Sequence, residues 1–373
     1  MNILIIPYNY PTKENQNRAI FVQDQVHMLR NQGDNVIVIG GIPKTISDII
    51  SSRSLHFGKH FEERWLITFP ALRGFNRFNN WLRTLCGKYL IKKYFKQNSG
   101  NLPDILHVHN SSSGELALWV KKKYNIPFVV TEHSSIMWSG YNKLSGLIFK
   151  ESKANIAVSK KFAQQLSQQY NENFYYIPNV VDTSYFKPMQ ITSKTDNNSF
   201  SIDSAVFVSV GNLTENKNHK LAIKALKRLL GKYNNLKLFI AGDGCERYNV
   251  QNLINTLELC DHVFLLGRLS RPEIRELLWR SDYFLLPSKS ETFGVALIEA
   301  MAAGLPTLSL KNGGSESIIS DNVGFIADND NDFIECMEQL LLTQYDKEHI
   351  IEHARLNFSQ GAVYQLLKQV YAL

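Results

Sequence analysis

Short runs of apolar residues alternate with amphipathic segments along most of the chain. The runs have the length of buried strands, and the segments between them repeat apolar residues at helical spacing. Strands are expected at 3–6, 36–39, 105–108, 128–131 and 156–158 in the first half, and at 206–210, 236–240, 263–266, 283–286, 307–310 and 324–327 in the second. Helices are expected at 21–30, 220–232, 272–279, 294–303 and 332–342. Such alternation builds parallel sheets, so the pattern predicts an α/β protein.

A polar segment divides this pattern into two halves. Residues 187–204 (KPMQITSKTDNNSFSIDS) are rich in turn-forming residues and lie between two periodic regions, which is typical of a linker. We therefore expect a first Rossmann-like domain over 1–186 and a second over 205–350, facing a central cleft, with ligands at the carboxyl ends of the strands. Residues 351–373 are expected to be helical, with a break near Gly361, and are a candidate to cross back to the first domain.

The composition excludes several classes of protein. With 373 residues, 44% of them hydrophobic and 20% charged, the chain can bury two cores, which excludes a disordered protein. The four cysteines are far apart and form no CxxC pair. Their spacing excludes a disulfide framework and a cysteine-rich zinc site, and favours a reducing compartment. No apolar run approaches the roughly 20 residues that span a bilayer, and no cleavable leader precedes the first strand, so we expect a cytoplasmic protein.

The positive charge is concentrated in the first half. The formal net charge is +7, and residues 1–186 carry 22 Lys and Arg against 12 Asp and Glu. The densest stretch, Arg73–Lys96, holds seven basic residues and no acid, with aromatic and aliphatic residues between them. Such a helix can lie on an anionic membrane surface, or it can pack its apolar stripe on its own sheet, and both interpretations stay open. Nucleic acid is disfavoured as a partner, because base-reading motifs are absent and the second half is acidic.

The stretch 287–306, PSKSETFGVALIEAMAAGLP, is the most informative one for chemistry. An expected strand leads into a loop, and a helix opens near Gly294. Free amides at a helix N-terminus form an anion site, and a glycine lets the anion approach closely. Glu291 lies in the loop and Glu299 inside the helix, so one carboxylate could meet hydroxyl groups at each end of a nucleotide sugar. The spacing alone also fits two solvent-exposed glutamates.

This stretch resembles the E-x7-E signature of the retaining GT-B glycosyltransferases of family 4 (glycosyl transferases group 1), including the EAMAxGxP that follows it. Further segments resemble motifs of the same family, in the same order and over nearly the whole chain. They are 18–25 (RGIFVxxQ, common among polysaccharide-building members), 131–133 (TEH), 157–159 (xVS), 179–186 (NGVDxxxF), 210–218 (VGRL with EKN), 241–244 (xGxG) and 266–268 (FxGx).

The resemblance implies a role for each matching residue. Lys217 would neutralise the leaving diphosphate, Glu291 would bind the donor sugar, and His133 would approach that sugar from the first domain, through its backbone as much as through its ring. The remaining donor-binding residues that it implies are Asn212, Gly242, Arg268, Phe293, Gly294, Val295 and Glu299. The amides of 293–295 would cradle the diphosphate, Glu299 would bind the ribose and Arg268 would flank the base. Arg18 and Ala19 would form a phosphate loop on the acceptor side.

The sequence departs from the family at two of these positions. Asn212 stands where the family has arginine, which removes a positive charge from the phosphate clamp. We hypothesise that Arg18 supplies the missing charge. Ala19 replaces a glycine, so we expect the loop to use a positive φ there less freely.

The resemblance also implies the substrates. We expect a hexosyl- or N-acetylhexosaminyltransferase with a UDP-sugar rather than a GDP-sugar as donor, no cofactor and no essential metal. Asp328, Asp330 and Asp332 lack the spacing of a calcium loop, and His107 and His109 lack a third metal ligand. The expected acceptor is a lipid-linked glycan of surface polysaccharide or oligosaccharide biosynthesis, with an undecaprenyl-diphosphate-linked glycan as the candidate. Its site would be the inner face of the cytoplasmic membrane.

Two alternatives stay open. The first is a GT-B protein without catalytic activity that binds a partner as a scaffold, which the replacement at Asn212 favours and which Lys217, Glu291 and Glu299 oppose. The second is a transferase that acts on a small soluble acceptor. In that case the stretch Arg73–Lys96 would be only structural.

Overall fold

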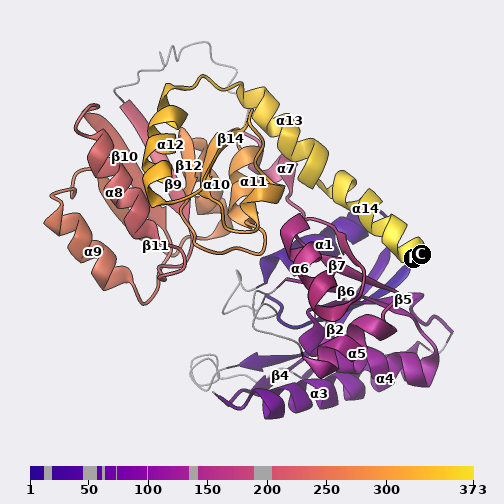
Figure 1. The fold of residues 1–373 in the computed structure, drawn as a ribbon. Helices are drawn as coiled ribbons and strands as arrows, with labels where there is room; N and C mark the ends of the chain where they lie inside the picture. The colour runs from indigo at the N-terminus through magenta and orange to yellow at the C-terminus, as the bar shows by residue number, and fades with distance from the viewer. Residues whose placement is uncertain are drawn as a thin grey trace. The chain divides into compact units, whose positions relative to one another are not determined.

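The computed structural model describes residues 1–11, 19–44, 57–60, 64–72, 74–98, 100–133, 142–188 and 204–373. The chain divides into two compact units (Figure 1), Met1–Val180 with Val363–Leu373, and Val181–Ala362. Each unit holds one sheet of predominantly parallel strands with helices connecting them. The predicted α/β class with two Rossmann-like domains is therefore confirmed.

The first unit is built on an eight-stranded sheet in the order β3-β4-β2-β1-β5-β6-β7-β8. The strands are β1 (Asn2–Pro7), β2 (Asn35–Lys44), β3 (Phe57–His60), β4 (Arg64–Pro70), β5 (Ile105–His109), β6 (Phe128–Glu132), β7 (Ala154–Ala157) and β8 (Phe174–Tyr176). Neighbouring strands are parallel except for the pair of β3 and β4. The central strands are buried along almost their whole length, which explains why they appear in the sequence as continuous apolar runs.

The helices of the first unit connect these strands. They are α1 (Ile20–Asn31), α3 (Asn76–Gln97), α4 (Gly114–Tyr124), α5 (Lys143–Glu151) and α6 (Lys160–Tyr170). Two of these helices begin at a side chain that caps their N-terminus. At α5, the side chain of Asn142 accepts hydrogen bonds from the amides of Leu144 and Ser145. At α6, the side chain of Ser159 accepts one from the amide of Phe162.

The second unit has a six-stranded, fully parallel sheet in the order β11-β10-β9-β12-β13-β14. The strands are β9 (Ser204–Val210), β10 (Asn235–Ala241), β11 (Val263–Gly267), β12 (Tyr283–Leu286), β13 (Thr307–Leu310) and β14 (Gly324–Ala327). Numbered from β9, this is the order 3-2-1-4-5-6 of a dinucleotide-binding sheet. The order reverses between β9 and β12, and ligands of such sheets bind beyond the carboxyl ends of the strands at that switch point.

The helices of the second unit are α7 (Thr183–Phe186), α8 (His219–Leu229), α9 (Arg247–Thr256), α10 (Arg271–Trp279), α11 (Val295–Ala302), α12 (Asp330–Leu342) and α13 (Lys347–Phe358). Helix α10 begins with a capping box between Ser270 and Glu273 and has Pro272 in its first turn. Helix α11 begins directly after Gly294, as expected from the sequence.

The boundaries of the units differ from those expected. The first unit ends at Val180 rather than at 186, because α7 belongs to the second unit, where the indole of Trp279 donates a hydrogen bond of 2.7 Å to the carbonyl of Phe186. The second unit extends beyond 350 and includes α13. The linker expected at 187–204 falls mostly on 189–203, which lie outside the described residues.

The end of the chain forms two helices that meet at Ser359, close to the break expected near Gly361. After α13, the last helix α14 (Gln360–Ala372) places its apolar side chains in the core of the first unit. Val363, Leu367 and Val370 of α14 pack there with Ile3 and Val26. A segment far away in the sequence thus completes the first core.

Candidate functional site

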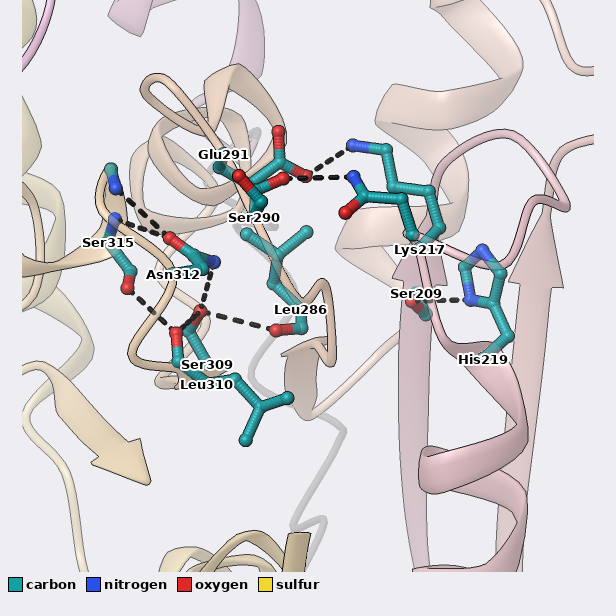
Figure 2. Close-up of polar contacts among 12 residues, drawn as sticks. Ser209, Lys217, His219, Leu286, Ser290, Glu291, Ser309, Leu310, Asn312 and Ser315 are labelled. Atoms are coloured by element: carbon teal, nitrogen blue, oxygen red, sulfur yellow. Dashed lines mark hydrogen bonds and ion pairs between the residues drawn. The ribbon is translucent and has the colours of Figure 1, made fainter. Parts of the chain in front are cut away.

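Two loops at the switch point of the second sheet hold a pair of opposite charges. Strands β9 and β12 are adjacent and parallel, so the loops that follow them leave the sheet at the same edge. Nζ of Lys217, in the loop after β9, lies 2.5 Å from Oε1 of Glu291, in the loop after β12. The two side chains are only 25% and 15% exposed, and Figure 2 shows them pointing toward each other. The structure therefore brings together the two second-unit residues to which the family resemblance assigns catalytic roles.

Two hydrogen bonds to backbone carbonyls join the same two loops. The side-chain amide of Asn216 donates a hydrogen bond of 2.9 Å to the carbonyl of Ser290, and the amide of Lys289 donates one of 2.8 Å to the carbonyl of Asn216. Lys217 and Glu291 are thus each one residue away from a hydrogen bond that ties their loops together. The position of the pair does not depend on their own long side chains alone.

A third loop, after β13, supports Glu291 from the other side (Figure 2). The amide of Glu291 donates a hydrogen bond of 3.0 Å to the carbonyl of Asn312. Oδ1 of Asn312 accepts from the amides of Gly314 and Ser315 at 3.1 and 3.0 Å, and its Nδ2 donates to Oγ of Ser309 at 3.1 Å. Our sequence reasoning missed this loop. The signal that could have indicated this loop is the glycine-containing run KNGGSE at 311–316, which directly follows the strand expected at 307–310.

Gly314 of this loop packs directly on the backbone of Phe293. A Cβ atom at Gly314 would lie 2.1 Å from the carbonyl oxygen of Phe293, so only glycine fits. Phe293 is buried, and Gly294 has a φ of 123°, which favours glycine as well. The residues expected to cradle a diphosphate, 293–295, are therefore fixed by close backbone packing.

The N-terminus of α11 is suited to bind an anion. Gly294 stands at its N-cap position and has no side chain that could accept a hydrogen bond from the first-turn amides. Such amides carry the positive end of the helix dipole, so an anion can take the place of a capping side chain. Glu299, expected at the ribose, lies on the same helix and is partly buried.

The remaining predicted residues of the second unit follow its first three strands. Gly242 after β10 has a φ of 153°, and a Cβ there would lie 1.8 Å from the carbonyl oxygen of Gly211. The Gly242 amide donates a hydrogen bond of 2.7 Å to the carbonyl of Gly267, at the end of β11. Asn212 and Arg268 follow Gly211 and Gly267 directly and are exposed. The loops after β9, β10 and β11 are thus held together by glycine backbone at the expected edge.

A buried histidine supports the Lys217 loop. His219 begins α8, and its Nδ1 lies 3.2 Å from Oγ of Ser209 on β9 (Figure 2). Burial lowers the pKa of His219 to about 4, although hydrogen bonds with the backbone of Gly211 and Asn212 act in the opposite direction. The ring is therefore neutral at pH 7 and adds no charge beside Lys217.

A cavity of about 330 Å³ lies beside the same loop. Its lining includes the ion pairs Lys220–Glu246 (2.6 Å) and Lys289–Glu215 (3.2 Å). None of the predicted site residues lines this cavity. It is a different feature from the expected diphosphate cradle, and both of its lysines already have carboxylate partners.

The predicted residues of the first unit lie after β6 and before α1. His133 follows β6, and its Nε2 lies 2.9 Å from Nδ1 of His109. Burial lowers the pKa of His133 to about 3, and a hydrogen bond with the side chain of Asn179 partly opposes this. The ring of Phe21, in the first turn of α1, lies 4.5 Å from the ring of His133.

The loop before α1 corrects one expectation. Ala19 adopts the left-handed conformation, with a φ of 51° and a ψ of 41°, at the N-cap of α1. The loop was expected to use a positive φ less freely with alanine than with glycine, yet it has one here, which costs roughly 1–2 kcal/mol relative to a right-handed conformation. Arg18 lies outside the described residues, so its compensation for Asn212 stays a prediction.

The described part of the chain contains no group of three His, Cys, Asp or Glu residues that could hold a metal ion. His107 and His109 are both buried, and their rings stack at a centroid distance of 4.5 Å. Nδ1 of His107 lies 2.6 Å from the hydroxyl of Tyr371, and its Nε2 lies 2.7 Å from Oγ1 of Thr131. Both ring nitrogens of His107 are thus occupied by protein hydroxyls.

Two protein-family models match the chain, one in each half. Residues 192–357 match the family described as "Glycosyl transferases group 1", and residues 19–185 match "Glycosyltransferase Family 4". Together the two matches cover most of the sequence.

Among curated relatives, the chain is 27% identical over 168 residues to a phosphatidylinositol N-acetylglucosaminyltransferase subunit of Arabidopsis thaliana, a match that covers 45% of this chain and 36% of that protein. It is 24% identical over 297 residues to alpha-monoglucosyldiacylglycerol synthase of Acholeplasma laidlawii, covering 72% of this chain and 71% of that one. The matched region therefore spans 36% of the length of the first relative and 71% of the length of the second.

Solved structures share the fold along the whole chain. Sucrose-phosphate synthase from Thermosynechococcus elongatus superposes with a TM-score of 0.77 at 16% identity, covering 100% of this chain and 98% of that one. HepE of Anabaena in complex with UDP superposes with a TM-score of 0.72 at 17% identity, covering 100% of both chains.

The close packing of Gly314 on Phe293 predicts a strong effect of one methyl group. Gly314→Ala forces a Cβ against the Phe293 carbonyl and displaces the segment from Glu291 to Val295. We expect UDP to bind at least roughly tenfold more weakly and unfolding to cost about 1–3 kcal/mol less. Isothermal titration calorimetry and urea unfolding measure the two effects. Gly361→Ala, where a Cβ meets nothing within 4 Å, is the control, and equal UDP affinity in both variants would contradict the prediction.

The buried histidines predict that acid destabilises the first unit. Burial lowers the pKa of His107 and of His133 to about 3 and that of His109 well below its usual value, against about 6.5 in an unfolded chain. The unfolded state then binds more protons, so this stabilisation is complete above about pH 6.5 and is lost as the pH falls toward 3. We therefore expect the free energy of unfolding of the first unit to fall as the pH is lowered through this window. Urea unfolding at pH 7, 6 and 5, with hydrogen exchange in β5 and β6, tests this; a stability independent of pH would refute it.

Proposed function

The chain belongs to family 4 of the GT-B glycosyltransferases, and we propose that it transfers a sugar from a nucleoside-diphosphate sugar to a hydroxyl group of a glycan. The observation that carries this proposal is the pair of Lys217 and Glu291 at the switch point of the second sheet, beside the N-terminus of α11. Cation, carboxylate and free helix amides are the groups that a diphosphate and a sugar require. The structure with UDP among the similar folds supports a nucleotide donor.

The proposed chemistry follows from what each group can bind. The diphosphate lies against the amides of 293–295, and Lys217 stabilises the charge that grows on it as the glycosidic bond breaks. Glu291 then accepts hydrogen bonds from the donor sugar, and Glu299 accepts them from the ribose. Without a donor, Lys217 and Glu291 neutralise each other, which keeps two largely buried charges from lying unpaired. An incoming diphosphate competes for the lysine and frees the carboxylate for the sugar.

The finer features of the reaction are also proposals. The anomeric configuration is retained, as the resemblance of 291–299 to E-x7-E suggests, and the leaving phosphate accepts the proton of the acceptor hydroxyl. The donor is a UDP-sugar rather than a GDP-sugar, the transferred group is a hexose or an N-acetylhexosamine, and no metal is required. The configuration of the product in proton NMR, and turnover with a chelator present, test these features.

A second observation favours an acceptor at a membrane. Helix α3 has two apolar stripes. The inner one, with Leu90, Ile91 and Phe95, is buried where α3 packs on β2 and β4. The outer one is exposed and consists of Phe78 (43%), Trp81 (55%), Leu85 (51%) and Tyr89 (59%). The two interpretations of residues 73–96 are therefore not exclusive, because one stripe packs on the sheet and the other does not.

The outer stripe has the chemistry of a surface that binds anionic lipid. Its residues recur at helical spacing, and the rings of Phe78 and Trp81 stack at 5.8 Å. Lys88, Lys92 and Lys96 lie along the same helix, and α3 contains no acidic residue. Aromatic side chains enter the lipid interface while lysines pair with anionic headgroups. No described helix is both long enough and apolar enough to cross a bilayer.

We therefore propose that the acceptor is a lipid-linked glycan, with an undecaprenyl-diphosphate-linked glycan as the candidate, and that α3 attaches the protein to the cytoplasmic face of the membrane. The names of two relatives support a lipid acceptor. One is a subunit of a phosphatidylinositol N-acetylglucosaminyltransferase, and the other is alpha-monoglucosyldiacylglycerol synthase. The product would then be a surface polysaccharide or oligosaccharide.

The first test removes the charged pair. We expect Lys217→Ala to lower turnover roughly 100- to 1,000-fold, because the leaving diphosphate loses its cation, and Glu291→Ala to lower it at least tenfold. A thermal-shift screen of UDP-, GDP- and ADP-sugars selects the donor, and release of the nucleoside diphosphate measures turnover. Lys289→Ala and Glu215→Ala are matched controls, since they break a neighbouring exposed pair. Equal rates in all four variants, or no turnover by the wild type with any donor, would refute catalysis here and favour the scaffold alternative.

The second test examines the outer stripe of α3. We expect the double variant Trp81→Gln with Leu85→Gln to lower binding to phosphatidylglycerol–phosphatidylcholine vesicles roughly tenfold or more, because two exposed anchors are lost. Co-sedimentation measures it. Tyr248→Gln, which removes an aromatic ring that is 74% exposed on α9, is the control. Equal binding to vesicles of phosphatidylcholine alone would argue against a role of charge, and no vesicle binding at all would favour a soluble acceptor.

A further inference from the structure

Asn312 is a buried amide, 5% exposed, in the loop after β13. Its Oδ1 accepts hydrogen bonds from the amides of Gly314 and Ser315, at 3.1 and 3.0 Å, which closes the loop into a tight turn. Its Nδ2 donates a hydrogen bond of 3.1 Å to Oγ of Ser309 on β13. Because a buried polar atom without a partner is costly, these contacts fix the place of the side chain.

The contacts of Asn312 hold one loop at both of its ends. The carbonyl of Asn312 accepts a hydrogen bond of 3.0 Å from the amide of Glu291. Oγ of Ser309, to which Asn312 is bonded, lies 3.2 Å from the carbonyl of Leu286, the last residue of β12 (Figure 2). The loop from Leu286 to Glu291 is therefore tied to the end of β13 where it leaves the sheet, and again where it presents the carboxylate.

We propose that Asn312 is a positioning residue for Glu291: its side chain shapes the turn after β13 so that its own carbonyl holds the backbone of Glu291 where the carboxylate faces Lys217. This inference rests on the proposed function, in which Glu291 binds the donor sugar. The atom that Asn312 holds is the amide of Glu291, so its effect on the sugar passes through the position of that residue.

Glu291 depends on such support because it lies in neither a helix nor a strand. No regular ladder of backbone hydrogen bonds fixes its Cα atom. Asn216 bonds to Lys289 and Ser290, which come just before it, whereas Asn312 bonds to Glu291 itself. A displacement of about 1 Å at a reacting centre can cost roughly 100-fold in rate. The bond from Asn312 is therefore placed where a small shift of the backbone moves the carboxylate.

Two substitutions separate the hydrogen bonds of Asn312 from its packing. Asn312→Leu keeps a side chain of similar size and removes the three side-chain hydrogen bonds. Asn312→Asp keeps an oxygen for the two amides of the turn, and Oγ of Ser309 can donate to its other oxygen. Asn329→Leu is the matched control, because Oδ1 of Asn329 accepts from the amides of Asn331 and Asp332 at 3.0 and 3.1 Å, in the same pattern after β14.

Circular dichroism and urea unfolding verify that each variant is folded before it is compared. If Asn312→Leu does not fold, Asn312→Ser takes its place. Serine keeps one acceptor for the amides of the turn and is too short to keep the contact with Ser309.

The first readout is hydrogen exchange of the Glu291 amide, recorded by NMR of 15N-labelled protein. We expect exchange at least roughly tenfold faster in Asn312→Leu, and close to the wild-type rate in Asn312→Asp and Asn329→Leu. The amide of Phe284, which bonds to the carbonyl of Pro306, reports opening of the sheet and is expected to stay unchanged. Equal exchange at Glu291 in the wild type and in Asn312→Leu would overturn the inference. This readout needs no turnover, so it decides the matter even if the proposed transferase activity fails.

The second readout is a double-mutant cycle, with the sugar nucleotide selected by the thermal-shift screen. We expect Asn312→Leu to lower kcat/KM roughly 10- to 100-fold, through misplacement of Glu291, and Asn312→Asp to recover most of the loss. Because Asn312 acts through Glu291, adding Asn312→Leu to Glu291→Ala is expected to lower the rate no further. Losses that multiply in the double variant, or an Asn312→Asp variant as slow as Asn312→Leu, would show that Asn312 only stabilises the loop, and would also overturn the inference.

Discussion

The contact between Lys217 and Glu291 depends on the order of strands in the second sheet. Because the order reverses between β9 and β12, two loops separated by more than seventy residues leave adjacent parallel strands at one edge. A lysine and a glutamate placed there meet each other, and the glutamate precedes Gly294, the N-cap residue of α11, by three residues. A strand order in which β9 and β12 were not adjacent would separate the cation from the carboxylate. The strand order therefore brings the two loops together, and the choice of lysine and glutamate then determines that the contact is an ion pair.

Glycine backbone gives this arrangement its stiffness. Gly242 lies against Gly211, and Gly314 lies against Phe293, at distances that exclude a Cβ atom. Loops that pack backbone to backbone have no side-chain rotamers to rearrange, so the amides that face an anion are held in place before it arrives. Such preorganisation matters for a diphosphate, because dipoles that are already oriented need not reorganise during the reaction.

Local pattern predicted those parts of the structure that depend on neighbouring residues. Strands β9 to β14 and the start of α11 after Gly294 follow from apolar runs and from a glycine at a helix start. The hydrogen bond from Glu291 to Asn312, the packing of α7 on α10 and the bond between Tyr371 and His107 join segments distant in sequence, and no local signal marks them. For the same reason the boundary at Val180 could not be read from the composition of the linker. The resemblance of 287–306 and its companions to one family supplied what periodicity could not, namely the expectation that Lys217 and Glu291 act together.

The two units carry different kinds of polar group. The second unit brings a cation, a carboxylate and helix amides to one edge, which suits a ligand with two negative charges. The first unit instead holds three imidazoles whose pKa values are lowered, and the buried His107 hydrogen-bonds with the neutral hydroxyls of Thr131 and Tyr371. A neutral imidazole carries no net charge that would attract a diphosphate, but it can still exchange hydrogen bonds with uncharged hydroxyl groups, as His107 does in the first unit.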